Sequence, residues 1–154
     1  MPSRPAGRLG AIVLVQDADG RVLLVRQPGG PFAGAWLLPG GTVERDEGIV
    51  AAAARELHEE TGLVLAEPRL VAQYQVWSEP PGGYDIALFC YRGSATGVLA
   101  QEAGGRARWW DPGILDDPHP VLRQELHDAG IRSDDPAAIA AALAAAGTRM
   151  ERLA

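Results

Sequence analysis

The strongest constraint on the fold is a helix-forming segment, residues 47–61, that is bounded by glycines and has strand-like sequence on both sides. It contains the alanine run 51–54, and Gly62 follows it as a typical C-terminal stop. Before it, Gly40 and Gly41 favour a tight turn that brings backbone close to a ligand. The apolar side of such a helix must be buried, so we expect it to pack against a sheet.

Strand patterns occupy most of the remaining chain. Residues 9–15 and 21–26 are apolar and separated by a turn sequence, which predicts a β-hairpin. A second hairpin is predicted from 70–77 and 86–91, with further strands at 36–41 and 106–110. Two terminal helices are expected at 120–129 and 135–145, the second with Asp135 as its N-cap. The sequence therefore predicts the α/β class.

Length and composition limit the remaining choices. With 154 residues and 47% hydrophobic content, we expect one domain, residues 1–154, with flexible ends at 1–8 and 147–154. The single cysteine, Cys90, cannot form an internal disulfide, and no signal peptide or membrane span is recognisable, so the expected location is the cytoplasm. A net charge of −6 argues against DNA, RNA or membrane surfaces as partners.

Three glutamates are predicted to share one face of the helix. At about 100° per residue, Glu56 and Glu60 lie roughly 40° apart, and Glu59 lies roughly 60° to the other side of Glu56. Arg55 stands four residues before Glu59 and is expected to pair with it, leaving Glu56 and Glu60 freer. Acidic runs on surface helices are common, so a merely solvated face is the alternative. Hard cations, however, prefer such oxygen ligands.

The residues around this face resemble a known signature. Residues 41–63 are similar to an intact Nudix box, with every fixed position filled: Gly41, Glu47, Arg55, Glu56, Leu57, Glu59, Glu60, Gly62 and Leu63. Trp36 and the preceding Leu38-Pro39-Gly40 also resemble the lead-in of that family. The resemblance implies an α/β/α sandwich with a mixed β-sheet, in which the box forms a loop, a helix and a second loop.

The resemblance also implies roles for particular residues. Glu56 and Glu60 are expected to bind Mg²⁺, with Mn²⁺ as a substitute, and Glu59 is expected to be a third ligand or a base. Glu102 resembles an additional catalytic glutamate of many small family members, with Glu79 and Asp85 as weaker rivals. The expected sets are catalytic Glu56, Glu59 and Glu102; metal-binding Glu56, Glu59, Glu60 and Gly40; substrate-binding Trp77, Arg26 and Trp36; and structural Gly41, Glu47, Arg55 and Gly62.

The function implied by the resemblance is Mg²⁺-dependent hydrolysis of a diphosphate in a nucleoside diphosphate linked to another moiety, releasing a nucleoside monophosphate. The substrate would be a small nucleotide, either ADP-ribose-like or a nucleoside triphosphate, and homodimer formation is left open. Two alternatives remain: a noncatalytic nucleotide-sensing module, and an RNA 5′-end pyrophosphohydrolase. The net acidity weighs against the second, since RNA binding usually needs a basic groove.

Overall fold

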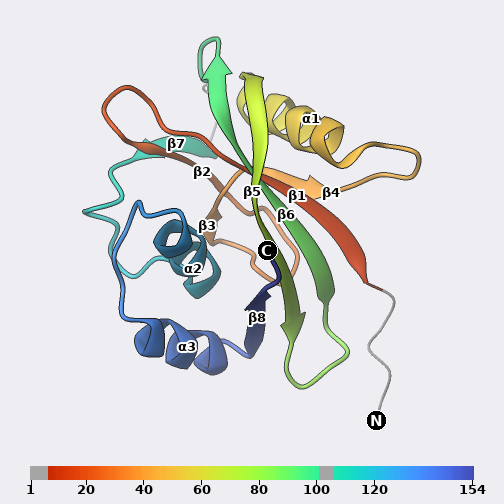
Figure 1. Ribbon diagram of the computed structural model, residues 1–154, viewed down its shortest axis with the longest axis vertical. Coiled ribbons are helices and arrows are strands. Elements are labelled where there is room, and N and C mark those ends of the chain that lie inside the picture. The colour runs from red at the N-terminus through yellow and green to blue at the C-terminus, as the bar shows by residue number, and fades with distance from the viewer. Residues whose placement is uncertain (1–6, 101–105) are drawn as a thin grey trace.

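The computed structural model describes residues 7–100 and 106–154. These residues form two small sheets and three helices, which Figure 1 shows in sequence colours. The elements in chain order are β1 Arg8–Leu14, β2 Val22–Arg26, β3 Trp36–Leu37, β4 Gly40–Thr42, α1 Ile49–Thr61, β5 Val64–Ser78, β6 Asp85–Thr96, β7 Ala107–Trp110, α2 Pro120–Asp128, α3 Pro136–Ala145 and β8 Thr148–Arg152.

The larger sheet is mixed, as expected. Its strand order is β4-β1-β6-β5-β8, in which β1 runs parallel to β6 and every other neighbouring pair is antiparallel. The smaller sheet has the order β3-β2-β7. The predicted hairpin of 70–77 with 86–91 is confirmed, and it extends to residue 64 on one strand and residue 96 on the other.

The first predicted hairpin is wrong beyond its turn. Strands β1 and β2 belong to different sheets, and the backbone pairing between them lies near the turn, at the bridge between Gln16 and Val22 and the hydrogen bond from Leu23 N to Val15 O, 3.1 Å long. Both strands are buried on two faces, so their continuous apolar runs carry no information about which neighbour they choose.

Helices cover both faces of the larger sheet. On one face, α1 packs against Ala11 and Val13 of β1, while Ile12 and Leu14 point to the opposite face and its helices, α2 and α3. This alternation along one strand is the geometric requirement of a sheet buried on both sides. Figure 1 shows α1 on one side and α2 with α3 on the other, which is the α/β/α arrangement.

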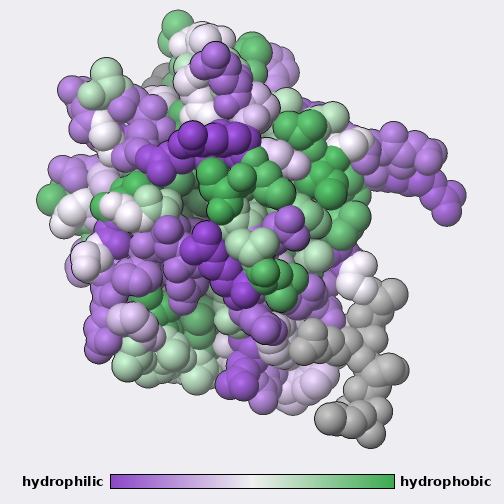
Figure 2. All heavy atoms as spheres, in the orientation of Figure 1, coloured by the Kyte–Doolittle hydropathy of each residue, from purple (hydrophilic) through white to green (hydrophobic). Residues whose placement is uncertain are grey.

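Helix α1 follows its prediction closely. It ends at Gly62, which adopts the left-handed conformation with φ 77° and donates its N–H to His58 O at 2.8 Å. Ala52, Ala53 and Leu57 are fully buried, which fixes the helix on the sheet. The preceding loop carries exposed Glu44 and neighbouring charged residues, and it projects from the body as a hydrophilic arm (Figures 1 and 2).

The end of the chain differs from the expectation of flexible termini. Residues 148–152 form β8, which pairs antiparallel with β5, and Arg8 already belongs to β1. Thr148 is buried and Tyr84 Oη lies 2.6 Å from its hydroxyl. This side-chain contact, together with the backbone pairing of β8 with β5, holds residues 148–152 in place. Of the described helices, none is long and apolar enough to cross a bilayer.

Candidate functional site

The double glycine turn lies directly against the acidic face of α1. Gly40 N–H donates to Glu60 Oε1 at 2.9 Å, which ties the helix to β4. The bare Cα of Gly41 makes room for Glu56: a Cβ added there would lie 2.6 Å from the Cδ and from an oxygen of that carboxylate. The absence of a side chain at Gly41 therefore lets the Glu56 carboxylate lie against β4.

Arg55 connects the loop to the glutamates. Its Nε and Nη2 donate to the two oxygens of Glu47 at 2.7 and 3.0 Å, and Nη1 donates to Glu59 at 3.1 Å and Glu56 at 2.9 Å. The predicted pair with Glu59 is confirmed, whereas the prediction that Glu56 is left free is wrong. The strongest geometry is the two-pronged contact with Glu47, whose pKa is lowered chiefly by these hydrogen bonds.

The predicted role of Glu47 as a loop stabiliser follows from these contacts. Besides Arg55, its carboxylate accepts a hydrogen bond from Glu44 N at 3.0 Å. Arg55 Nη2 also donates to Thr42 O at 3.2 Å, so the guanidinium links β4, the loop and the helix. Gly62 and Gly41 complete this frame at the two ends of the segment.

The electrostatics of Glu60 are unusual for a glutamate. Burial, with the nearby charges of Glu56 and Glu59, raises the pKa of Glu60 to about 8, although the Gly40 N–H bond favours the charged form. At neutral pH a proton therefore resides on this acidic cluster in the absence of a cation. A divalent cation beside Glu60 would remove the repulsion that keeps the proton there.

The oxygen donors suit a hard divalent cation that also takes phosphate ligands. Within residues 7–100 and 106–154, no three acidic, histidine or cysteine side chains already converge as a cation cage. The reason is visible in the contacts: Arg55 draws Glu59 and Glu56 toward itself while Glu60 turns to Gly40. Mg²⁺ is commonly held by only one or two carboxylates with substrate phosphates and water, so a closed cage is unnecessary.

A pocket of about 240 Å³ begins at the same glycines. Its walls come from β1, β4, β5, β6, α2 and the loop before β3, and they include Ile12, Val76 and Leu88. Gly40 and Gly41 line this pocket and also contact the glutamates of α1. The glycine turn is therefore the part of the structure that the pocket and the carboxylates of Glu56 and Glu60 have in common.

The three residues expected to bind substrate lie outside the lining of this pocket. Trp77 is on β5 and lines a different depression between α3 and β8. Trp36 packs edge-to-face on Trp110 at 5.2 Å, with Arg108 5.6 Å from its ring, and Arg26 is exposed on β2. Alternation along β5 explains the placement of Trp77, since the neighbouring Val76 is the residue that reaches the pocket.

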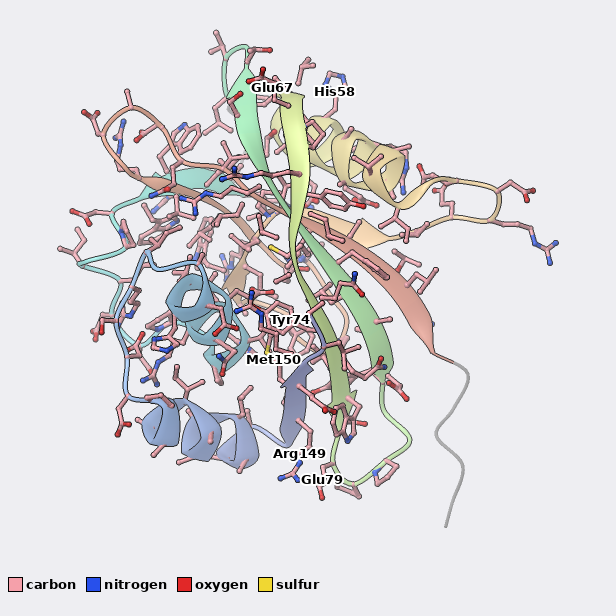
Figure 3. All side chains as sticks on the ribbon, viewed as in Figure 1. His58, Glu67, Tyr74, Glu79, Arg149 and Met150 are labelled. Atoms are coloured by element: carbon pink, nitrogen blue, oxygen red, sulfur yellow. The ribbon has the colours of Figure 1, made fainter. Side chains whose placement is uncertain are left out.

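The family resemblance predicts an additional catalytic carboxylate, with Glu102 as its first candidate. Glu102 lies outside the described residues. Its rivals have other partners: Asp85 is buried and accepts a hydrogen bond from Gln75, and Glu79 pairs with Arg149 at 3.0 Å. Figure 3 shows Glu79 and Arg149 at one end of the molecule. Helix α1, marked by the outward-pointing His58, lies at the other end. Glu79 is therefore far from the glutamate helix, and the carboxylate of Asp85 is engaged with Gln75.

The three histidines are surface or structural residues. His58 is exposed. His119 is the N-cap of α2, accepting a hydrogen bond from Val121 N at 3.2 Å, and His127 accepts one from Asp134 N at 3.3 Å. The first interaction caps helix α2, and the second holds the segment that follows it.

Sequence reasoning missed Glu125. This residue is on α2, is only 5% exposed and lines the pocket beside Ile12 and Val76. Its neighbours Leu122 and Leu126 mark the buried side of α2, and a glutamate three residues after Leu122 falls on that same side. The available signal was thus an acidic residue within an apolar helical stripe.

Comparison with known proteins agrees with this geometry. The family model of the NUDIX domain matches residues 7–129, which is most of the chain. The chain belongs to the Nudix family. The Nudix match ends within the segment after α2, and α3 and β8 follow it.

Individual relatives are of moderate similarity. An ADP-ribose pyrophosphatase of Methanocaldococcus jannaschii is 36% identical over 72 residues, 47% of this chain and 43% of that protein, so less than half of that relative's length is spanned. A Bacillus subtilis protein with the provisional name 8-oxo-dGTP diphosphatase is 37% identical over 109 residues, 69% of this chain and 68% of that one. The crystal structure of a MutT Nudix hydrolase from Burkholderia pseudomallei superposes with a TM-score of 0.70 at 26% identity, covering 80% of this chain and 98% of that one.

Proposed function

We propose that this Nudix protein is a divalent-cation-dependent pyrophosphohydrolase that cleaves the diphosphate of a small nucleotide. One observation carries the proposal: the carboxylates of Glu56 and Glu60 lie against Gly41 and Gly40, which also line the pocket. The glycine turn thus adjoins two regions. At the glutamates of α1, cations could bridge the carboxylates to the phosphates of the substrate. The pocket could hold the group attached to those phosphates. The names of the hydrolase relatives support this class of reaction.

In the proposed site, Glu56 and Glu60 would hold the cation, and Glu59 would be a third ligand or a base. When bound, the cation would neutralise diphosphate charge and lower the pKa of a water molecule. Gly40 N–H orients Glu60, and Arg55 orients Glu56 and Glu59 while its own position is fixed by Glu47. These supporting contacts keep the reactive carboxylates in place, which is what precise orientation in catalysis requires.

The proposed reaction is attack of water on one phosphorus of the diphosphate. The bond from that phosphorus to the bridging oxygen breaks, and the water proton passes to Glu59 or to solvent. The products are a nucleoside monophosphate and the second phosphate with its attached group. No covalent intermediate on the protein is needed, in keeping with the structural roles of His119 and His127.

The finer assignments belong to the same proposal. The cation is Mg²⁺, with Mn²⁺ as a substitute, and the substrate is ADP-ribose-like or a nucleoside triphosphate. We place the protein in the cytoplasm, which suits the unpaired and buried Cys90. Homodimer formation is tested by light scattering coupled to size-exclusion chromatography.

The decisive experiment is hydrolysis of a substrate panel by the purified protein with Mg²⁺ or Mn²⁺. The panel contains ADP-ribose, ATP, 8-oxo-dGTP, a dinucleoside polyphosphate and a 5′-triphosphorylated RNA oligonucleotide, with monophosphate release followed by chromatography. Glu60→Gln should lower kcat by at least about 10²-fold, because loss of one preorganised electrostatic contact commonly costs that much.

The matched control is Glu151→Gln, since Glu151 is exposed on β8. It should retain normal turnover. Near-normal turnover of Glu60→Gln would contradict the role of that residue. No turnover of any panel member, with nucleotide binding retained, would instead support the sensing module, and exclusive turnover of RNA would support the 5′-end pyrophosphohydrolase.

A further inference from the structure

The pocket beside the glycine turn contains one deeply buried acidic residue. Glu125 lines it from α2 and is 5% exposed, whereas Arg8 of β1 and Thr42 of β4, which also line it, are exposed. Most of the other lining side chains are apolar, as for Ile12 and Val76. In such pockets a few placed polar groups fix the orientation of the ligand.

The Glu125 carboxyl group has no hydrogen-bond or ion-pair partner among residues 7–100 and 106–154. The polar groups that surround it are engaged with each other. Tyr74 on β5 donates to Asp128 at 2.7 Å, and Gln124 donates to the other oxygen of Asp128 at 2.9 Å. No protein group in the described part of the chain satisfies this carboxyl group, and because Glu125 lines the pocket, a ligand there could supply the missing partner.

Positive charges near Glu125 are also bound elsewhere. Arg92 on β6 and Arg152 on β8 line a small adjoining cavity of about 50 Å³ that Glu125 shares. Arg92 donates to Gln16 at 2.6 Å, and Arg152 donates to Ala154 O at 3.0 Å. Burial, with the charge of Asp128 nearby, raises the pKa of Glu125 to about 8, so the neutral carboxylic acid predominates at pH 7.

A neutral carboxylic acid presents one donor and one acceptor side by side. The edge of adenine offers the complementary pair, the N6 amino donor next to a ring-nitrogen acceptor. Both hydrogen bonds can form with a single side chain. Guanine presents three polar groups on its pairing edge, one more than a single carboxylic acid can pair, and most side chains around the pocket are apolar, as for Val76 and Leu88.

We propose that Glu125 is a specificity-determining residue that pairs with the adenine edge of the substrate, with the base in the pocket and the phosphates at the glycine turn. The inference rests on the proposed function, because it assumes a nucleotide substrate. It deepens that function by predicting that, among the candidate substrates, the protein prefers nucleotides whose base is adenine. The geometry that supports it is continuous: Gly40 lines the pocket and also binds Glu60.

The test compares nucleotides with and without the exocyclic amine in wild type and in three variants. Binding of AMP, GMP and purine riboside 5′-monophosphate is measured by NMR titration, and kcat/KM is measured for ADP-ribose and its analogue without the exocyclic amine. Wild type should prefer the compounds with the amine by about tenfold, the size expected for a hydrogen bond whose loss leaves a buried group unpaired. AMP should also bind more tightly than GMP.

Glu125→Leu should reduce the preference for the amine to about twofold or less. Glu125→Gln is the matched variant, because an amide retains one donor and one acceptor in nearly the same shape, and it should keep most of the preference. Glu151→Gln should behave as wild type. Circular dichroism shows whether each variant is folded. The ratio of AMP to GMP affinity is measured on wild type alone, so it tests the inference even if a variant does not fold.

Two outcomes would overturn the inference. One is tighter binding of GMP than AMP by wild type, and the other is an unchanged amine preference in Glu125→Leu. Either result could accompany full hydrolysis of nucleotides, in which case the proposed function survives. Absence of hydrolysis with every substrate would contradict the proposed function itself.

Discussion

Two adjacent glycines in β4 are needed for different physical reasons. A Cβ at Gly40 would fall on the Ala11 carbonyl oxygen and lie 2.7 Å from Ile12 Cγ2, so it would collide with β1. The three atoms nearest to a Cβ at Gly41 all belong to the carboxylate of Glu56, the far end of a flexible side chain. The first glycine is required by the fold and the second by the position of one glutamate.

This difference predicts separate effects of the two alanine substitutions. Gly41→Ala should lower kcat/KM by about ten- to a hundredfold, because the Glu56 carboxylate must move by roughly an ångström. Its free energy of unfolding should change by less than about 1 kcal/mol. Steady-state kinetics and urea unfolding of the same preparation measure the two quantities.

Gly40→Ala is the counterpart and should lose stability, by about 1–3 kcal/mol or more, since backbone atoms of β1 cannot yield cheaply. If Gly41→Ala retained full activity while folded, the position of Glu56 against the turn would be irrelevant to the reaction. If both variants lost only stability, the two glycines would share one structural role.

Single side chains also show what the sequence could predict about the site. Helical spacing was sufficient to place Glu56, Glu59 and Glu60 together, because it depends only on local geometry. It could not show that Arg55 would bind Glu56, since that contact depends on where Glu47 anchors the guanidinium. The position of Trp77 was missed for a similar reason: the turn sequence after it does not tell which face of β5 it occupies.

Among the elements, α3 and β8 contribute to the core although they follow the segment that matches the family model. Ile139 and Leu143 of α3 are buried in the cluster that also contains Ile12 and Leu14 of β1. The sequence predicted α3 from its N-cap and proline, and Asp135 does accept a hydrogen bond from Ala137 N at 3.2 Å. It did not predict β8, because residues 148–152 are mostly polar and lie at a sheet edge.

The contribution of α3 can be measured with one core substitution. Ile139→Ala should lower the free energy of unfolding by about 2–5 kcal/mol, the usual cost of truncating a fully buried aliphatic residue. Ile114→Ala is the matched control, since Ile114 is 77% exposed, and it should change stability by no more than about 0.5 kcal/mol. Chemical unfolding followed by tryptophan fluorescence serves both.

The result also tests whether α3 folds with the rest of the chain. We propose one domain, so Ile139→Ala should shift the single main transition. A normal main transition in that variant, with an early separate loss of helix signal in circular dichroism, would show that α3 unfolds independently.

At the scale of the whole molecule, two apolar clusters lie on opposite faces of the larger sheet, and each borders one unusual glutamate. Glu60 is on α1, beside the cluster of Ala11 and Val13, and Glu125 is on α2 within reach of the cluster of Ile12 and Leu14. Burial is the main cause of the raised pKa of both residues, each to about 8. The fold therefore holds two protons that the unfolded chain releases near pH 4.5.

These two groups predict that stability falls as the pH rises. Between pH 4.5 and 8 the native protein binds more protons than the unfolded chain, so the free energy of unfolding decreases with increasing pH. From pH 7 to 9 the expected loss is roughly 1 kcal/mol for each group, from 1.36 kcal/mol per pKa unit. Urea unfolding in EDTA, at constant ionic strength, measures it across this range.

The double variant Glu60→Gln and Glu125→Gln should show a much flatter profile, because glutamine does not titrate. Cys90 also has a pKa raised by burial, but it is present in both proteins and so cancels in the comparison. His119, with its pKa lowered from 6.5 by burial, has already lost its proton in both states above pH 7. A slope that persists unchanged in the double variant would mean that neither glutamate carries its proton in the native state, and the electrostatic account of both sites would be wrong.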